Sequence, residues 1–164
     1  VQDLRPEVLE KSPLPEAIKQ VVQDWTQQSG IPAQTTITGT HNHLHPEAET
    51  TLIRAVQEAL ANVQKHAQAS SAQVTLSYMD DVLMLDIQDN GIGLENASPP
   101  SNGGGYGLTA MRQRVSQVGG SLAVESEPGE GTTVVIQLPI QQMAQLQSVQ
   151  QEDTYETNSR SSRG

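Results

Sequence analysis

The chain has 164 residues, a formal net charge of −10, and neither cysteine nor phenylalanine. The negative charge disfavours nucleic acid and anionic membranes as partners, and the absence of cysteine excludes a disulfide framework or a thiolate zinc site. No apolar run approaches the roughly 20 residues that cross a bilayer, and no signal-peptide pattern is present, so we expect a cytoplasmic location. Because the first residue is not methionine, we expect a piece of a longer protein.

Apolar spacing predicts three helices. The first is expected to have Ser12 as its N-cap and Pro13 at its first position, and it is closed at Gly30. The second covers residues 47–67 and has the clearest three- and four-residue apolar spacing. The third runs from about residue 108 to residue 118, where two glycines stop it.

Alternating β-branched and apolar residues predict five strands, at residues 33–39, 72–78, 82–88, 121–127 and 132–139. The last four form two antiparallel pairs with short turns. This order of elements predicts an α+β fold, a two-layer α/β sandwich whose mixed, mostly antiparallel sheet is covered on one face by about three helices. Residues 13–140 are expected to form one domain, and the Gln- and Ser-rich residues 141–164 a disordered tail.

One face of the second predicted helix is polar. Glu58, Asn62, Lys65 and His66 follow one another at three- and four-residue intervals, so they share one side of the helix. This side combines a carboxylate, an amide and cationic groups. On its own, the pattern is more typical of a solvated helix face than of a binding site.

Three glycine-containing segments follow that helix. In "DNGIG", Asp89 ends an apolar strand, and Gly91 and Gly93 allow positive φ and close approach to a ligand, although Asn-Gly is also an ordinary turn dipeptide. In "GGGYGLTAM", glycines precede a helix whose free N–H groups suit an anion. In "EPGEGTT", a turn delivers Thr132 to the start of a strand. Together with the polar helix face, these segments are hard to assign to chance.

The segments "LRPEVLEKSPL", "QEALANVQKHA", "DNGIGL", "GYGLTAMRQRV" and "GGSLAVESEPGEGTTVVIQLP" resemble the ATP-binding superfamily of gyrase, heat-shock chaperones, histidine kinases and mismatch-repair ATPases. The resemblance covers Asp3 to Pro139 and is closest to sensor histidine kinases of the nitrate-sensor and lipid-thermosensor type. It implies the ATP-binding fold of that superfamily (the Bergerat fold), with ATP and Mg²⁺ as ligands. Residues 1–12 resemble the exit from a dimerisation helix.

The resemblance also implies roles for individual residues. Asn62 would bind Mg²⁺ through its amide oxygen, and Asp89 would accept a hydrogen bond from the exocyclic amine of adenine. Glu58 would organise the waters of the metal rather than act as a base. The implied catalytic residues are Glu58, Asn62 and Lys65. The implied ATP-binding residues are Asn62, Lys65, His66, Asp89, Gly91, Gly93, Leu94, Gly105, Tyr106, Gly107, Leu108 and Thr132.

The chain departs from the family pattern at three positions. Leu94 stands where the family often has Phe, Tyr106 where it often has His, and Ala110 where it usually has Gly. None of these changes removes a predicted ligand of the nucleotide. Tyr106 nevertheless weakens the case for a phosphate or metal role at its position.

The phosphate acceptor of such kinases is a histidine on a separate helical domain. His41, His43 and His45 alternate in a segment that we expect to be a loop rather than a metal site, and none of the four histidines lies in a long amphipathic helix beside an acidic residue. The resemblance therefore implies three partners: ATP, a dimerisation domain of the parent kinase, and a response regulator with a helix-turn-helix output domain. The isolated chain should be monomeric and the parent homodimeric.

Two alternatives stay open at this stage. "GYGLTA" satisfies the dinucleotide pattern G-x-G-x-x-A, and Glu125 follows at a suitable distance, but no strand leads directly into Gly105. An anti-sigma-type serine kinase or a non-catalytic ATP-binding module on the same fold is the second alternative.

Overall fold

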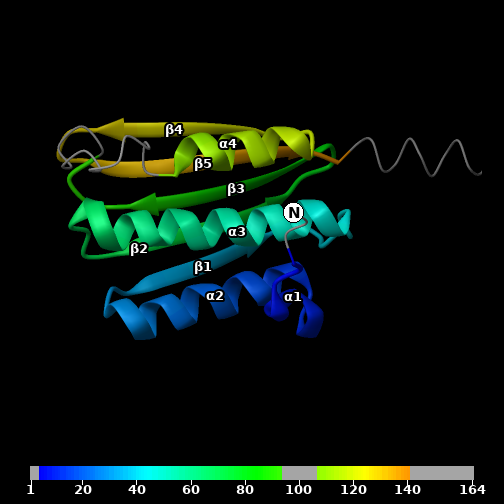
Figure 1. The fold of residues 1–164 in the computed structure, drawn as a ribbon, viewed down its shortest axis with the longest axis horizontal. Coiled ribbons are helices and arrows are strands. Elements are labelled where there is room, and N and C mark those ends of the chain that lie inside the picture. Colours follow the sequence, from blue (N-terminus) through cyan, green and yellow to red (C-terminus); the bar gives the residue numbers. More distant parts are fainter. Residues whose placement is uncertain (1–3, 94–106, 141–164) are drawn as a thin grey trace, which may run out of the picture.

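The computed structural model of the protein describes residues 4–93 and 107–140, apart from the side chains of residues 66 and 67 (Figure 1). Its helices are α1 (Glu7–Lys11), α2 (Leu14–Ser29), α3 (Pro46–Asn62), the π-helix η1 (Val63–Ala67) and α4 (Leu108–Gln117). Its strands are β1 (Ala33–Thr38), β2 (Ala72–Tyr78), β3 (Val82–Asp89), β4 (Ser121–Glu127) and β5 (Gly131–Pro139). The predicted strands and helices are confirmed to within one residue, except that the second helix ends as a π-helix and α1 was not expected.

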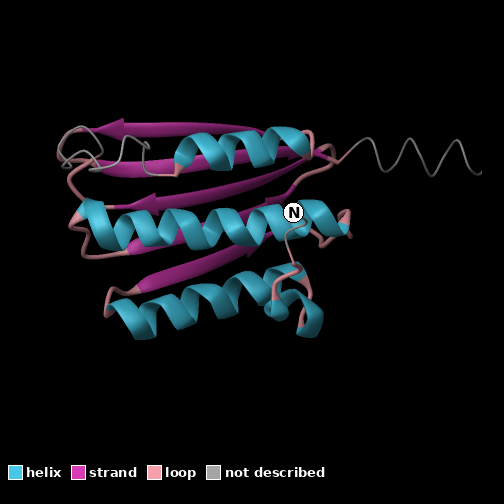
Figure 2. Cartoon of the chain, in the orientation of Figure 1, coloured by secondary structure: helices cyan, strands magenta, loops and turns pink. Residues whose placement is uncertain are grey.

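The strands form one sheet in the order β1-β2-β3-β5-β4. Strands β1 and β2 are parallel, and the other three neighbouring pairs are antiparallel. In the described part of the chain the helices form a second layer on one face of this sheet (Figure 2). The predicted two-layer α+β fold with a mixed, mostly antiparallel sheet is confirmed.

The core lies between the two layers and is aliphatic. Side chains alternate between buried and half-buried along β2 and along most of β3, which is the pattern of a sheet with one covered face. Leu76, Leu85 and Ile136 are fully buried from neighbouring strands. The only aromatic residues in the described core are Trp25 and Tyr78, as expected for a chain without phenylalanine.

Helix α3 runs across the middle of the helical layer, between α2 and α4 (Figure 1). It buries Leu52, Ile53, Val56 and Leu60 against the sheet and its neighbours. Because these residues repeat at helical spacing, the opposite face of α3 stays outside the core and presents Glu58. One face of α3 therefore builds the core, while the other presents polar side chains to the solvent.

The N-terminal segment packs onto the same layer. Leu9 of α1 is buried in the common core, and Arg5 forms an ion pair of 3.3 Å with Glu49 of α3, which is only 9% exposed. The predicted cap of the first long helix is displaced by one residue: Pro13 is the N-cap of α2, while Ser12 ends α1. A division between linker and domain after residue 12 stays a prediction, and the tail beyond residue 140 lies outside the described residues.

Candidate functional site

Two buried polar residues meet at one end of the sheet. Asp89, the last residue of β3, is the register partner of Thr132 at the start of β5. The two residues are 6% and 8% exposed. Both stand at positions whose side chains face the helical layer, because they alternate in phase with the buried residues of their strands.

The Asp89 carboxylate is held by its own loop. The backbone N–H of Gly91 donates to Asp89 Oδ1 at 2.8 Å. Burial raises the pKa of the Asp89 carboxyl, and backbone hydrogen bonds from Gly91 and Thr132 offset part of this effect. A carboxylate that is removed from water and fixed by N–H groups is suited to accept a hydrogen bond from a ligand in one defined direction.

The loop after Asp89 packs on the turn between β4 and β5. Gly93 has φ of 82°, and a Cβ at that position would collide with the backbone carbonyl of Glu127. The positive φ predicted for this glycine is therefore confirmed. Gly91, in contrast, is not among the described glycines with positive φ, and its N–H is used by Asp89. The predicted close approach of Gly91 and Gly93 to a ligand stays a prediction.

Ser126 was not identified from the sequence. Its hydroxyl lies 3.1 Å from that of Thr132, and it also donates to the Gly131 carbonyl at 3.4 Å. The pair joins β4 to β5 directly beside Asp89. A serine in an alternating strand gives no signal by itself, because the partnership depends on the register between two strands.

Asn90 joins this end of the sheet to the segment that follows α3. Its Oδ1 accepts hydrogen bonds from the backbone N–H groups of Ser70 and Ser71 at 2.9 and 3.0 Å, and its Nδ2 donates to Ser70 Oγ at 2.8 Å. The end of α3 and the end of β3 are therefore brought to the same edge of the molecule. The interpretation of Asn90 as an ordinary turn residue missed this contact.

The polar face of α3 ends in a wider turn. Asn62 closes the α-helix and is half-buried, and the π-helix continues through exposed Lys65 to residue 67. A single π-turn rotates the residues after it relative to those before it, and such turns are common at functional sites. In an ideal α-helix, Lys65 would lie on the same side as Glu58 and Asn62. The π-turn rotates Lys65 away from that side.

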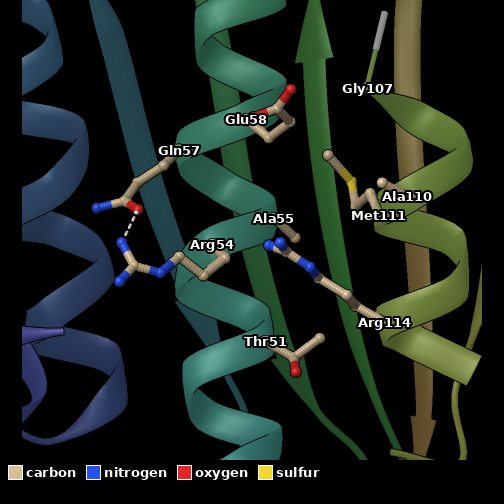
Figure 3. A pocket seen from close by; sticks show the side chains of 9 residues that line it. All are labelled: Thr51, Arg54, Ala55, Gln57, Glu58, Gly107, Ala110, Met111 and Arg114. Carbon is tan, nitrogen blue, oxygen red and sulfur yellow. Dashed lines mark hydrogen bonds between the residues drawn. The ribbon is translucent and has the colours of Figure 1, made fainter. Parts of the chain in front are cut away.

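A groove separates α3 from α4 and ends beside Glu58. Its volume is about 280 Å³, and its lining residues are Thr51, Arg54, Ala55, Gln57, Glu58, Gly107, Ala110, Met111 and Arg114 (Figure 3). Gly107 is the N-cap of α4, with φ of 73°, and a Cβ there would overlap Glu58 Oε1. Glu58 and the beginning of α4 are therefore in direct contact.

The structure brings the predicted site residues into two groups. Asp89, Gly91, Gly93 and Thr132 surround the end of β3, while Glu58 and Asn62 lie on α3, with Glu58 in contact with Gly107. The predicted residues Leu94, Gly105 and Tyr106 lie outside the described residues, as does the side chain of His66. The assignment of all these residues to a nucleotide stays a prediction.

The three alternating histidines lie between β1 and α3. The rings of His41 and His43 are 5.2 Å apart, and His45 Nδ1 accepts a hydrogen bond from the N–H of Glu47 and so caps α3. Among the described residues, no group of three or more His, Cys, Asp or Glu side chains is arranged to hold a metal ion. Nor does any described helix combine the length and apolar character of a membrane span.

The chain belongs to the family of histidine kinase-, DNA gyrase B-, and HSP90-like ATPases, whose model matches residues 47–142. The dinucleotide alternative is wrong, because that fold places its glycine-rich helix between parallel strands. Here α4 leads into β4, which pairs antiparallel with β5, and β1 and β2 are the only parallel pair among the described strands.

Two curated relatives are named as histidine kinases. The chain is 32% identical over 140 residues to the signal transduction histidine-protein kinase/phosphatase DegS of Brevibacillus brevis, and 37% identical over 137 residues to UhpB of Salmonella typhimurium. These matches cover 85% and 83% of this chain but 36% and 26% of the relatives. The chain thus spans about a quarter to a third of the length of these relatives.

A solved structure supports the fold. The histidine kinase domain of the blue-light activated histidine kinase of Erythrobacter litoralis EL346 matches with a TM-score of 0.64 and 24% identity, over 79% of this chain and 66% of that one.

Proposed function

We propose that this chain is the ATP-binding catalytic domain of a two-component sensor histidine kinase. It binds Mg-ATP and presents the γ-phosphate to a histidine on a separate dimerisation domain. The observation that carries the proposal is the Asp89 carboxylate, which is buried and held by the Gly91 and Thr132 backbone in a chain of an ATPase family.

Asp89 would recognise the base. Its carboxylate would accept a hydrogen bond from the exocyclic amine of adenine, and Thr132 would add a second polar contact. Guanine presents a carbonyl oxygen at the same position, so two acceptors would face each other at a cost of about 1–3 kcal/mol. The site should therefore prefer adenine to guanine.

Asn62 would hold the metal. An amide oxygen is a ligand that Mg²⁺ accepts, and this ion commonly keeps several waters and is shared with substrate phosphates. The absence of an acidic or histidine cluster in the described part of the chain fits such sparse coordination. The bound ion would neutralise phosphate charge. Lys65 would contact phosphate, and Glu58, one turn before Asn62, would orient metal-bound water.

The start of α4 would receive the phosphates. Gly107 is its N-cap, no cap hydrogen bond from a side chain is found among the described residues, and its first N–H groups have no partner within the helix. Free N–H groups and the positive end of the helix favour an anion. Phosphoryl transfer would then depend on positioning and charge neutralisation rather than on a covalent step on this domain.

The transfer requires partners. The proposed acceptor is a histidine of the dimerisation domain of a homodimeric parent, which would phosphorylate a response regulator with a helix-turn-helix output domain. The proposed location is the cytoplasm, and the isolated chain should be a monomer. His41, His43 and His45 lie in the loop before α3 and are not proposed as acceptors.

The test is calorimetry with ATP, ADP, GTP and NAD, each with and without Mg²⁺. Wild-type chain should bind Mg-ATP more tightly than GTP or NAD. Asp89→Asn should weaken ATP binding by about tenfold and reduce the preference over GTP. Asp86→Asn is the matched control, because Asp86 lies on the same strand but on its opposite face. Unchanged ATP affinity in a folded Asp89→Asn variant would remove Asp89 from the base site, and no nucleotide binding by wild type would end the proposal.

A further inference from the structure

Glu58 and Gly107 are in contact where α3 faces the beginning of α4 (Figure 3). The space that a side chain at Gly107 would need is filled by the Glu58 carboxylate. Helix α4 has ten residues, and its N-cap has no side-chain hydrogen bond. The Glu58 carboxylate therefore lies beside the electropositive end of a helix, where an anion is favoured.

The Glu58 carboxylate is exposed and takes part in none of the ion pairs found among the described residues. Those pairs are Arg5–Glu49 and Lys11–Glu7. Figure 3 shows Arg54 turned toward Gln57, to which it donates a hydrogen bond of 3.1 Å, and Arg114 reaching across the groove toward Ala55. In this view, neither arginine points toward the Glu58 carboxylate.

Asn62 lies one helical turn after Glu58 on the same side of α3. Any phosphate that approaches both Asn62 and the start of α4 must therefore pass close to a carboxylate. Like charges within about 10 Å repel each other at 0.1 M salt, and the repulsion grows as the ionic strength falls.

We propose that Glu58 makes nucleotide binding depend on the divalent ion. Its carboxylate lies beside the anion-favouring end of α4, so a triphosphate without metal is repelled, and one whose charge is reduced by Mg²⁺ is accepted. This inference rests on the proposed function, and it makes Glu58 a determinant of selectivity between two charge states of the same nucleotide.

The proposal differs from a role in metal binding alone. If Glu58 only oriented metal-bound water, its neutralisation would weaken Mg-ATP binding and leave metal-free ATP unaffected. If Glu58 repels the bare triphosphate, Glu58→Gln must strengthen metal-free binding. The direction of change in the metal-free state therefore separates the two roles.

The experiment measures dissociation constants of the purified chain for ATP with excess Mg²⁺, for ATP with EDTA, and for adenosine, in low and high salt. Competition with a fluorescent ATP analogue extends the range to weak binding. In low salt, Glu58→Gln should bind metal-free ATP about tenfold more tightly than wild type, and this gain should shrink in high salt. Adenosine has no phosphate, so its affinity should not change.

Two further variants provide controls. Glu58→Asp keeps the charge and should retain the metal dependence of wild type. Glu10→Gln removes one negative charge from an exposed position on α1 and should leave every affinity unchanged. A gain in Glu10→Gln equal to that in Glu58→Gln would assign the effect to net charge and overturn the proposal.

Other results also overturn it. If Glu58→Gln leaves metal-free ATP as weakly bound as in wild type, or changes adenosine equally, Glu58 does not select the charge state, although Mg-ATP binding by wild type would still support the proposed function. If wild type binds neither Mg-ATP nor adenosine, the proposed function fails and this inference fails with it.

Discussion

Asn90 and Ser70 are joined by two hydrogen bonds, one from the Ser70 backbone N–H to Asn90 Oδ1 at 2.9 Å and one from Asn90 Nδ2 to Ser70 Oγ at 2.8 Å. A third bond from the Ser71 N–H completes the contact at 3.0 Å. This amide ties the segment after α3 to the end of β3, and so it connects the two groups of predicted site residues.

Asn90→Ala should lower the free energy of unfolding by about 1–2 kcal/mol, because hydrogen bonds in this partly solvated contact contribute modestly. It should also weaken ATP binding, since the ends of α3 and β3 lose their link. Chemical denaturation and calorimetry measure the two effects. Asn90→Asp keeps the acceptor and should retain more stability than alanine. Equal stability of wild type and Asn90→Ala would show that the link is not needed.

Asp86→Asn should stabilise the protein at neutral pH. One oxygen of Asp86 is buried without a hydrogen-bond partner in the described structure, and burial, together with the nearby Glu125 charge, raises the pKa of its carboxyl. Since the folded state binds this proton more tightly than the unfolded state, stability falls as the pH rises through the ordinary carboxyl range. The melting temperature of Asp86→Asn should exceed that of wild type by roughly 2–6 °C at pH 7.

The same comparison at low pH is the control for Asp86. Below the pKa of the unfolded carboxyl both chains are neutral at this position, so the difference in melting temperature should disappear. Glu125→Gln removes the smaller cause of the raised pKa and should give a smaller increase at pH 7. A difference that persists unchanged at pH 3 would exclude ionisation of Asp86 as its cause.

Asn62→Ala should reduce ATP affinity with Mg²⁺ more than without it, by about tenfold in the ratio, because the variant loses an amide ligand of the metal. Calorimetric titration in Mg²⁺ and in EDTA measures that ratio. Gln57→Ala on the same helix is the control, since Gln57 is exposed and bonds to Arg54. Equal losses in both conditions would reject a metal role for Asn62.

Gly131→Ala should destabilise the fold more than Gly129→Ala. Both glycines have positive φ, 86° and 80°, but a Cβ at Gly131 would overlap the Asp89 carbonyl while one at Gly129 meets open space. The second variant therefore reports the backbone strain alone, roughly 1–2 kcal/mol, and the first adds a collision. Denaturant melts of the two variants measure the difference. Similar stability would mean that β5 can move away from Asp89.

The fold was predictable because its signals are local. The apolar spacing of residues 47–67 and the alternation in 72–78 and 82–88 identify α3, β2 and β3 without reference to any other segment. Helix α1 was missed because five residues are too few to show a helical period. The π-turn at the end of α3 was missed for a related reason, since it changes the winding of the chain but not the identity of the apolar residues.

The candidate site was predictable only in part. Asp89 is recognisable because an acid follows an apolar strand and precedes two glycines. The functions of Asn90 and Ser126 depend on Ser70 and Thr132, which are brought near by register and loop packing. The contact of Glu58 with Gly107 likewise joins two helices, so helical spacing within α3 could not reveal it.

The attachment of the N-terminal segment to α3 has a mechanical consequence. Arg5 is paired with Glu49, and Arg54 donates to the Leu4 carbonyl at 3.3 Å, so the polypeptide enters the domain along the helix that carries Asn62 at its far end. A force on the chain ahead of Leu4 would therefore act on α3, a stiff helix about 25 Å long. A small tilt of this helix would displace Asn62, at its far end, the most.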